Sequence, residues 1–157
     1  MWAGGRAQER EIDMKKWQRV VVGVDGSDGS RLALEAAVEE ARDHGAALTV
    51  LTTWTQPMAA GAPGYAPLQW INEADLSGVA KQAQADVLAA VLGPEPSFTV
   101  DQRVVEGHPA HELVLAAEGA DLVVVGSRGH GGFAGMLLGS VSQHVVAHAP
   151  CPILVVR

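Results

Sequence analysis

Short runs of β-branched residues alternate along the chain with segments in which apolar residues recur at helical spacing. The first run, Val20–Val24, is apolar at almost every position, which is typical of a strand buried on both faces of a parallel sheet. Beyond it, Leu34, Val38 and Ala41 recur at intervals of three and four, and Gly45 is placed to end a helix. Residues 20–45 therefore predict one strand followed by one helix.

The same alternation continues to the last residues. It predicts strands at Ala47–Thr53, Phe98–Val105, Leu122–Val125 and Ile153–Val156, and helices at Glu73–Leu92, Pro109–Glu118 and Ser140–His148. Five apolar strands separated by helices predict a doubly wound α/β fold in a single domain, with a five-stranded parallel sheet and helices on both faces, because parallel strands need crossover connections. The long connection Thr55–Ile71, rich in proline and glycine, is expected to be a mobile flap or a partner surface.

Composition restricts the class of protein. The chain has 157 residues, of which 48% are hydrophobic, so we expect one packed domain over residues 16–157. Residues 1–15 mix glycine with charged residues and are expected to form a flexible N-terminal extension. A net charge of -7 and 4% aromatic residues argue against a nucleic-acid partner, and no stretch reaches the ~18 apolar residues of a membrane span. A single cysteine, Cys151, allows no intrachain disulfide, so a cytoplasmic location is expected.

Candidate chemistry follows two of the predicted strands. In open α/β sheets ligands bind at the carboxyl ends of strands, and here Asp25-Gly26-Ser27 follows the first strand. A glycine-rich run begins at Gly126 after the fourth strand and continues to Gly139 and Ser140. Such loops expose backbone N–H groups that hold phosphate at a helix N-terminus. Ser140 is expected both to cap the following helix and to donate to a phosphate oxygen.

The distribution of charge favours the second of these loops. All 18 acidic residues lie at or before Asp121, whereas Arg128 and Arg157 follow it. Residues 1–121 therefore have a net charge of -9 and residues 122–157 a net charge of +2. An anion is expected to approach the loop after the fourth strand more readily than the rest of this acidic chain.

Other phosphate-binding motifs do not match. The chain has no Gly-Lys pair, which excludes a Walker loop. A loose dinucleotide pattern, Gly129-x-Gly131-x2-Ala134, lacks the acidic residue expected about 20 positions later. A phospho-acceptor receiver domain would need more acidic residues near the first strand than Asp25 and Asp28.

Metal-dependent and covalent catalysis are also disfavoured. His144 and His148 are one helical turn apart, but no carboxylate accompanies them, so a packing or surface role is expected rather than a zinc site. The chain has no Gly-x-Ser-x-Gly nucleophile motif, and Cys151 lies between two prolines. An efficient hydrolase is therefore not expected.

The glycine spacing is specific. Gly126-x2-Gly129-x9-Gly139-Ser140, followed by Val141 and Ser142, resembles the Gly-x2-Gly-x9-Gly-Ser/Thr signature of ATP-binding universal stress proteins. Three further segments resemble that family: the opening strand Val20–Ser27, the helix start Gly107–Ala110 and the closing strand Ala149–Val156. The resemblance covers residues 16–157.

This resemblance implies sheet order 3-2-1-4-5, with ATP bound between strands one and four. It implies that Asp25 contacts the ribose and that Thr53 holds the adenine edge through its backbone; Thr52 stands where such proteins often have histidine. Further nucleotide-binding residues are implied or suggested by their place in the motif: Gly126, Ser127, Arg128, Gly129, Gly139, Ser140, Val141 and Ser142. A carboxylate suits ribose hydroxyls better than phosphate, although Asp25 is also placed to form an Asx turn into Gly26. Arg128 and the neighbouring His130 either reach phosphate or remain solvated.

The function expected from these features is that of an ATP-binding regulatory protein in a stress response. Its cofactor would be ATP, with Mg²⁺ on the phosphates; the metal ligands and the physiological adenine nucleotide stay open. Alternatives are a slow Mg-dependent ATPase or autophosphorylating enzyme with a loop serine as acceptor, and a nucleotide-free scaffold dimer. A homodimer through the last strand is expected because Ile153–Val156 is apolar and carries no charge to protect a sheet edge.

Overall fold

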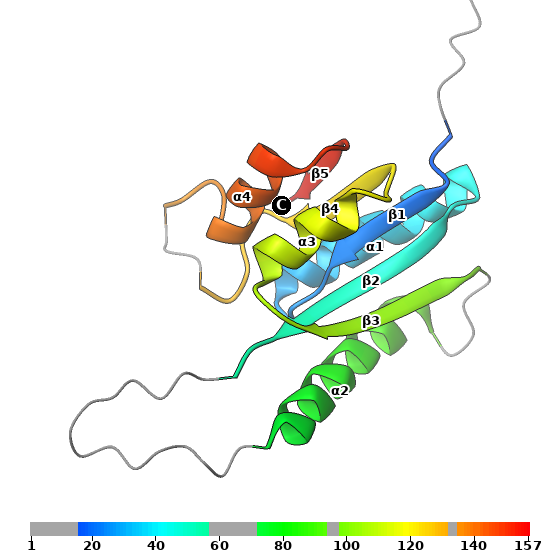
Figure 1. Ribbon diagram of the computed structural model, residues 1–157. Helices are drawn as coiled ribbons and strands as arrows, with labels where there is room; N and C mark the ends of the chain where they lie inside the picture. The colour runs from blue at the N-terminus through cyan, green and yellow to red at the C-terminus, as the bar shows by residue number, and fades with distance from the viewer. Residues whose placement is uncertain (1–15, 57–71, 94–97, 132–134) are drawn as a thin grey trace, which may run out of the picture.

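The computed structural model describes residues 16–56, 72–93, 98–131 and 135–157, and these form one sheet and four helices (Figure 1). In chain order the elements are β1 (Arg19–Gly23), α1 (Asp28–His44), β2 (Ala47–Trp54), α2 (Glu73–Leu92), β3 (Val100–Glu106), α3 (Pro109–Ala117), β4 (Leu122–Gly126), α4 (Ser140–His148) and β5 (Ile153–Val156). The expected extension, residues 1–15, and residues 57–71 of the long connection lie outside the described residues. No helix among the described residues is long and apolar enough to cross a membrane.

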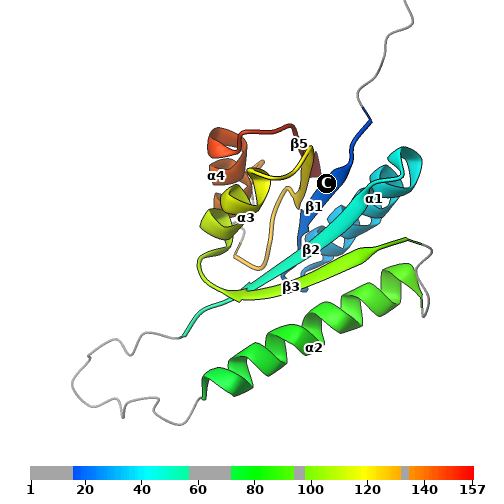
Figure 2. The ribbon, with the colours of Figure 1, turned by 45° about the vertical axis from the view of Figure 1, so that its right-hand side comes forward.

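The sheet has the predicted topology. All its strand pairs are parallel and the order is β3-β2-β1-β4-β5. Side chains alternate between the two faces, so Val20 and Val22 pack in a core with α1 and α2, while Val21 packs with α3 and α4. In Figure 2, α2 runs alongside β2 and β3 at one end of the sheet, and α4 lies near β5 at the other. The central strands are therefore buried on both faces, as their apolar sequence predicts.

The helix ends mostly follow the predicted chemistry. Ser27 caps α1 by accepting a hydrogen bond from the Ser30 N–H at 3.2 Å, and Gly45 ends this helix at φ 65°. The prediction that Ser140 caps α4 is wrong, because Gly139 occupies the cap position with extended dihedral angles and Ser140 is the first helical residue. The start of α4 thus has no side-chain cap.

The central strands β1 and β4 place the candidate loops next to each other. They are neighbours in the sheet, but β1 leads into α1 on one face and β4 leads toward α4 on the other. A Cβ atom on Gly126 would lie 2.7 Å from the carbonyl carbon and oxygen of Gly29, so the end of β4 packs directly on the first turn of α1. This juxtaposition is the topological switch point at which open α/β sheets bind ligands.

Candidate functional site

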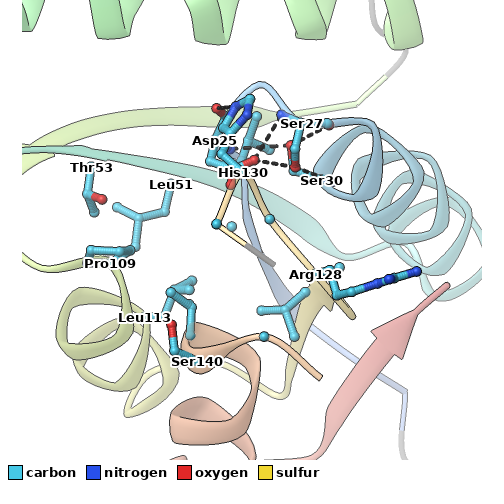
Figure 3. A pocket seen from close by; sticks show the side chains of 18 of the residues that line it. Asp25, Ser27, Ser30, Leu51, Thr53, Pro109, Leu113, Arg128, His130 and Ser140 are labelled. Carbon is cyan, nitrogen blue, oxygen red and sulfur yellow. Dashed lines mark hydrogen bonds between the residues drawn. The ribbon is translucent and has the colours of Figure 1, made fainter. Parts of the chain in front are cut away.

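A cavity of about 560 Å³ opens at the carboxyl ends of the strands. Figure 3 shows Thr53, Leu51 and Pro109 at one end of it, with Asp25 and His130 farther along. Leu113 of α3 and Ser140 of α4 form another part of the wall. The cavity therefore has an apolar wall from β2 and α3 and a polar wall from the loops after β1 and β4.

Asp25 is held at this site by its own loop. Its Oδ1 accepts hydrogen bonds from the Ser27 N–H at 2.9 Å and from the Ser27 hydroxyl at 2.5 Å, which forms the Asx turn noted as an alternative role. Burial alone would raise the pKa of the Asp25 carboxyl, but hydrogen bonds from Ser27 and Ser30 and the charge of nearby His130 together hold the pKa below its ordinary value. Asp25 is therefore a carboxylate at neutral pH and an acceptor for hydroxyl groups.

The loop after β4 rests against Asp25. A Cβ atom on Gly129 would lie 2.5 Å from Asp25 Oδ2, so a side chain at residue 129 would require the Asp25 carboxylate to move. His130 Nε2 lies 2.8 Å from the backbone oxygen of Asp25. His130 thus contacts the neighbouring loop, a role that its position in a glycine-rich run does not reveal.

The N-terminus of α4 forms the anion-attracting part of the wall. Gly139, Ser140 and Val141 line the cavity, and no side chain caps the first turn of this helix. Helix N-termini carry unsatisfied N–H groups and a partial positive charge, which together favour a phosphate. The arrangement can accept an anion without a lysine.

Eight of the ten residues predicted to bind nucleotide line this cavity. They are Asp25, Thr53, Gly126, Arg128, Gly129, Gly139, Ser140 and Val141. The other two, Ser127 and Ser142, are not brought into it. Ser142 is 4% exposed and donates its hydroxyl to the backbone oxygen of Gly126 at 2.6 Å, so it supports the end of β4 from beneath. Ser127 belongs to a hollow on the α1 side of the sheet.

The side chain of Arg128 is exposed, as in one of the two roles expected for it. Its residue borders the cavity, but in Figure 3 its side chain points away from Thr53 and Pro109, toward α1 and β5. Thr52 also faces away, because its hydroxyl donates to the Val24 oxygen at 2.9 Å and accepts from Gln84 Nε2 at 3.1 Å. Side-chain direction at these positions follows from the packing of α1 and α2 against the sheet.

Sequence reasoning missed the apolar wall. Leu51, Pro109 and Leu113 line the cavity, yet their residue types alone are those of any strand or helix core. The spacing of Pro109 and Leu113, one helical turn apart, could have placed them on one face of α3. Among the described residues there is no cluster of three or more His, Cys, Asp or Glu that could hold a metal ion.

The sequence of this chain is similar to those of known proteins. The model of the universal stress protein family matches residues 16–157. Universal stress protein Rv2623 of Mycobacterium tuberculosis is 40% identical over 138 residues, which cover 88% of this chain and 44% of that protein. The chain therefore spans less than half the length of such curated relatives.

Two solved structures share the fold over nearly the whole domain. Universal stress protein UspA from Lactobacillus plantarum gives a TM-score of 0.76 at 27% identity, over 91% of this chain and 99% of that chain. A universal stress protein in complex with cAMP gives a TM-score of 0.64 at 28% identity, with the same coverage. The carboxyl-end cavity thus occurs in a fold with at least one nucleotide-bound representative.

Proposed function

The chain belongs to the universal stress protein family, and from this membership we propose that it is an ATP-binding regulatory protein of a stress response. In this proposal nucleotide occupancy changes the order of the loops after β1 and β4 and so changes partner contact. The uncapped N-terminus of α4 beside the glycine-lined cavity is the observation that carries the proposal.

Two further observations support nucleotide as the ligand class. The cavity volume, about 560 Å³, lies within the range of roughly 300–1,000 Å³ typical of small-molecule sites. A relative of the same fold at 28% identity has been solved in complex with cAMP. The cavity volume and the cAMP complex of the relative both favour an adenine nucleotide as the ligand over a site that only contacts a partner protein.

The cavity suggests one orientation for the nucleotide. The adenine ring would lie against Leu51, Pro109 and Leu113, with the Thr53 backbone at its edge. The ribose hydroxyls would donate to Asp25, whose carboxylate is ionised at neutral pH. The phosphates would lie over the motif residues that line the cavity, namely Gly126, Gly129, Gly139, Ser140 and Val141.

The ligands of Mg²⁺ would come from the nucleotide more than from the protein. The described residues offer no cluster of three metal-binding side chains. Mg²⁺ commonly binds through substrate phosphates, waters and one or two carboxylates, so it would enter with ATP. The chemistry it supplies there is partial neutralisation of the phosphate charge.

Replacement of Gly139 tests the site directly. A Cβ atom on Gly139 would have its nearest neighbour at 3.5 Å, an ordinary contact, so Gly139→Val is expected to fold. Its side chain would cover the α4 N-terminus and weaken ATP binding by roughly a hundredfold, the loss of about two charge-assisted hydrogen bonds. Isothermal titration calorimetry measures this loss.

The matched control is Gly78→Val, because a Cβ atom on Gly78 in α2 meets nothing within 4 Å and α2 does not line the cavity. Its ATP affinity should equal that of the unmodified chain. Unchanged affinity in a folded Gly139→Val variant would refute this site. Titrations with AMP, ADP, ATP and cAMP, together with mass spectrometry of nucleotide released on denaturation, would identify the physiological ligand.

A further inference from the structure

A buried side-chain amide joins α2 to the two strands that it packs against. Gln84 of α2 is 2% exposed. Its Nε2 lies 3.0 Å from the backbone oxygens of Val50 in β2 and Arg103 in β3, and 3.1 Å from the Thr52 hydroxyl. Figure 2 shows α2 running alongside both strands. Because carbonyl oxygens can only accept hydrogen bonds, the NH₂ end of the amide faces them, and Gln84 acts here as a donor.

This amide fixes the direction of the Thr52 hydroxyl. Thr52 is 6% exposed, and its Oγ1 accepts the hydrogen bond from Gln84. The single proton of the hydroxyl is donated to the Val24 oxygen at 2.9 Å. Val24 is itself 4% exposed, so its oxygen needs a donor. A chain of hydrogen bonds thus runs from α2 through Thr52 to the residue after β1.

This chain ends where the backbone hydrogen-bond ladder between β1 and β2 stops. The last paired residues are Gly23 and Leu51, and the Val24 N–H still donates to the Leu51 oxygen at 2.9 Å. The next bond of a parallel ladder would run from the Thr53 N–H to the Val24 oxygen. Within the described residues that bond is not formed, and the Thr52 hydroxyl donates to the Val24 oxygen instead. A side chain therefore replaces the backbone donor at the end of the ladder.

The backbone of Thr53 faces the nucleotide cavity as a result. Strand residues two apart direct their N–H and C=O groups to the same side, so those of Thr53, like those of Leu51, point toward the β1 side. Val24 and Thr53 both line the cavity. An N–H beside a C=O matches the edge of adenine, which has an acceptor at N1 and an amino donor at N6. Guanine presents the reverse pattern, with a donor at N1 and an acceptor at O6.

We propose that Thr52 and Gln84 are positioning residues that set the preference of the site for adenine over guanine. The Thr52 hydroxyl satisfies the Val24 oxygen and so leaves the Thr53 N–H available to N1 of adenine. Gln84 orients that hydroxyl. Neither Thr52 nor Gln84 lines the cavity, so both act through the backbone. The inference rests on the proposed nucleotide site and adds the residues behind it that select the base.

Replacement of Thr52 tests this role. Thr52→Val removes the hydroxyl, so the Val24 oxygen takes the Thr53 N–H as its donor and the ladder gains one bond. ATP affinity should fall roughly tenfold, the loss of about one hydrogen bond, whereas GTP affinity should change by less than about twofold. The ratio of ATP to GTP affinity, measured by isothermal titration calorimetry, should therefore fall. A merely loosened site would weaken both nucleotides alike and leave the ratio unchanged.

Three further variants make the result specific. Thr52→Ser retains the hydroxyl and should keep most of the ATP-to-GTP ratio. Gln84→Met removes the amide that orients the hydroxyl but leaves the hydroxyl in place, so it should lower the ratio by roughly two- to threefold. The control is Thr49→Val, the same substitution at a residue of β2 that does not line the cavity. It should leave the ratio unchanged.

Hydrogen exchange of the Thr53 amide reports the end of the ladder without any nucleotide. In the nucleotide-free unmodified chain this amide should exchange roughly tenfold or more faster than the amides within the β1–β2 ladder. In Thr52→Val it should become protected, because it then donates to the Val24 oxygen.

The outcomes separate this inference from the proposed function. If the unmodified chain binds no ATP, the proposed function fails and the inference fails with it. If the chain binds ATP but Thr52→Val keeps the unmodified ATP-to-GTP ratio, the inference alone is overturned. Protection of the Thr53 amide in the nucleotide-free unmodified chain would overturn it as well.

Discussion

At the scale of single residues, Asp25 joins local structure to the proposed ligand. One of its carboxylate oxygens holds the turn after β1 through Ser27, and the other lies against Gly129 of the neighbouring loop. The Asx turn and the proposed nucleotide-binding role are therefore compatible, because the turn uses only one of the two carboxylate oxygens of Asp25. In the structure Asp25 forms the Asx turn, and its carboxylate remains available to accept hydrogen bonds from a ribose.

The lowered pKa of Asp25 predicts a pH-dependent contribution to stability. Because the pKa is lower in the folded chain than in the unfolded chain, this contribution is fully present above the unfolded value of about 3.9 and is lost as the pH falls through the folded value. The difference in unfolding free energy between the unmodified chain and Asp25→Asn should be constant from about pH 5 to 8 and shrink at lower pH. Urea unfolding at several pH values measures it. A difference that grows as the pH falls would contradict the assignment.

At the scale of elements, the end of β4 packs closely against the start of α1, next to the nucleotide cavity. Gly126 lies so close to Gly29 that a side chain at residue 126 would meet backbone atoms, which cannot move aside by rotating a torsion. The Ser142 hydroxyl holds the same residue from the α4 side. Helices α1 and α4, which lie on opposite faces of the sheet, thus both contact the end of β4 at Gly126.

Gly126→Ala should therefore destabilise the fold. We expect a loss of roughly 1–3 kcal/mol in unfolding free energy, the usual cost of overpacking. Chemical denaturation measures this loss, and Gly131→Ala serves as the control because a Cβ atom there meets nothing within 4 Å. Equal stability of the two variants would show that β4 and α1 can separate at no cost.

At the scale of the whole molecule, β5 ends the sheet with an apolar strand. The oxygens of Pro152 and Val156 accept hydrogen bonds from Val123 and Ser127 on the β4 side. Since strand residues alternate, the N–H and C=O groups of Ile153 and Val155 point toward the outer edge. We propose that a second copy pairs there in antiparallel fashion about a twofold axis, which would cover both edges.

Val155→Pro tests this homodimer without disturbing β4. Proline removes only an outward N–H at this position, so the variant should fold and shift to a monomer in light scattering at micromolar concentration. Leu154→Pro is the contrasting variant, because it removes an N–H on the β4 side and should lower stability as well. The dimer proposal fails if the unmodified chain is itself monomeric at that concentration.

From the chemistry of the whole site we also expect that ATP binds but is hydrolysed only slowly. The Asp25 carboxylate, with its lowered pKa and two hydrogen bonds from Ser27, is a weak base for activating water. Turnover in the presence of Mg²⁺ should stay well below about 1 per second, the lower end of ordinary enzymes. Phosphate release from stringently purified protein measures it, and turnover at or above that rate would favour the ATPase or autophosphorylating alternative.

Much of the fold is determined by local sequence. The bounds of α2, α4 and β5 match the hydrophobic pattern residue for residue, and β3 begins two residues later than expected. These elements are predictable because side-chain period, glycine stops and proline positions act over a few residues. The place of the glycine motif after β4 follows in the same way, and the sheet order agrees with the family resemblance.

The direction of individual side chains around the site was decided only by the tertiary structure. The Arg128 side chain points toward α1 and β5, the Ser142 hydroxyl donates to the Gly126 oxygen, and the apolar wall comes from β2 and α3. The sequence does not distinguish the directions of these side chains. The spacing of the glycines specifies the path of the backbone, but not which face of the sheet each residue between them faces. That choice depends on how α1, α3 and α4 pack against β1 and β4, through contacts between residues about a hundred positions apart, such as His130 and Asp25.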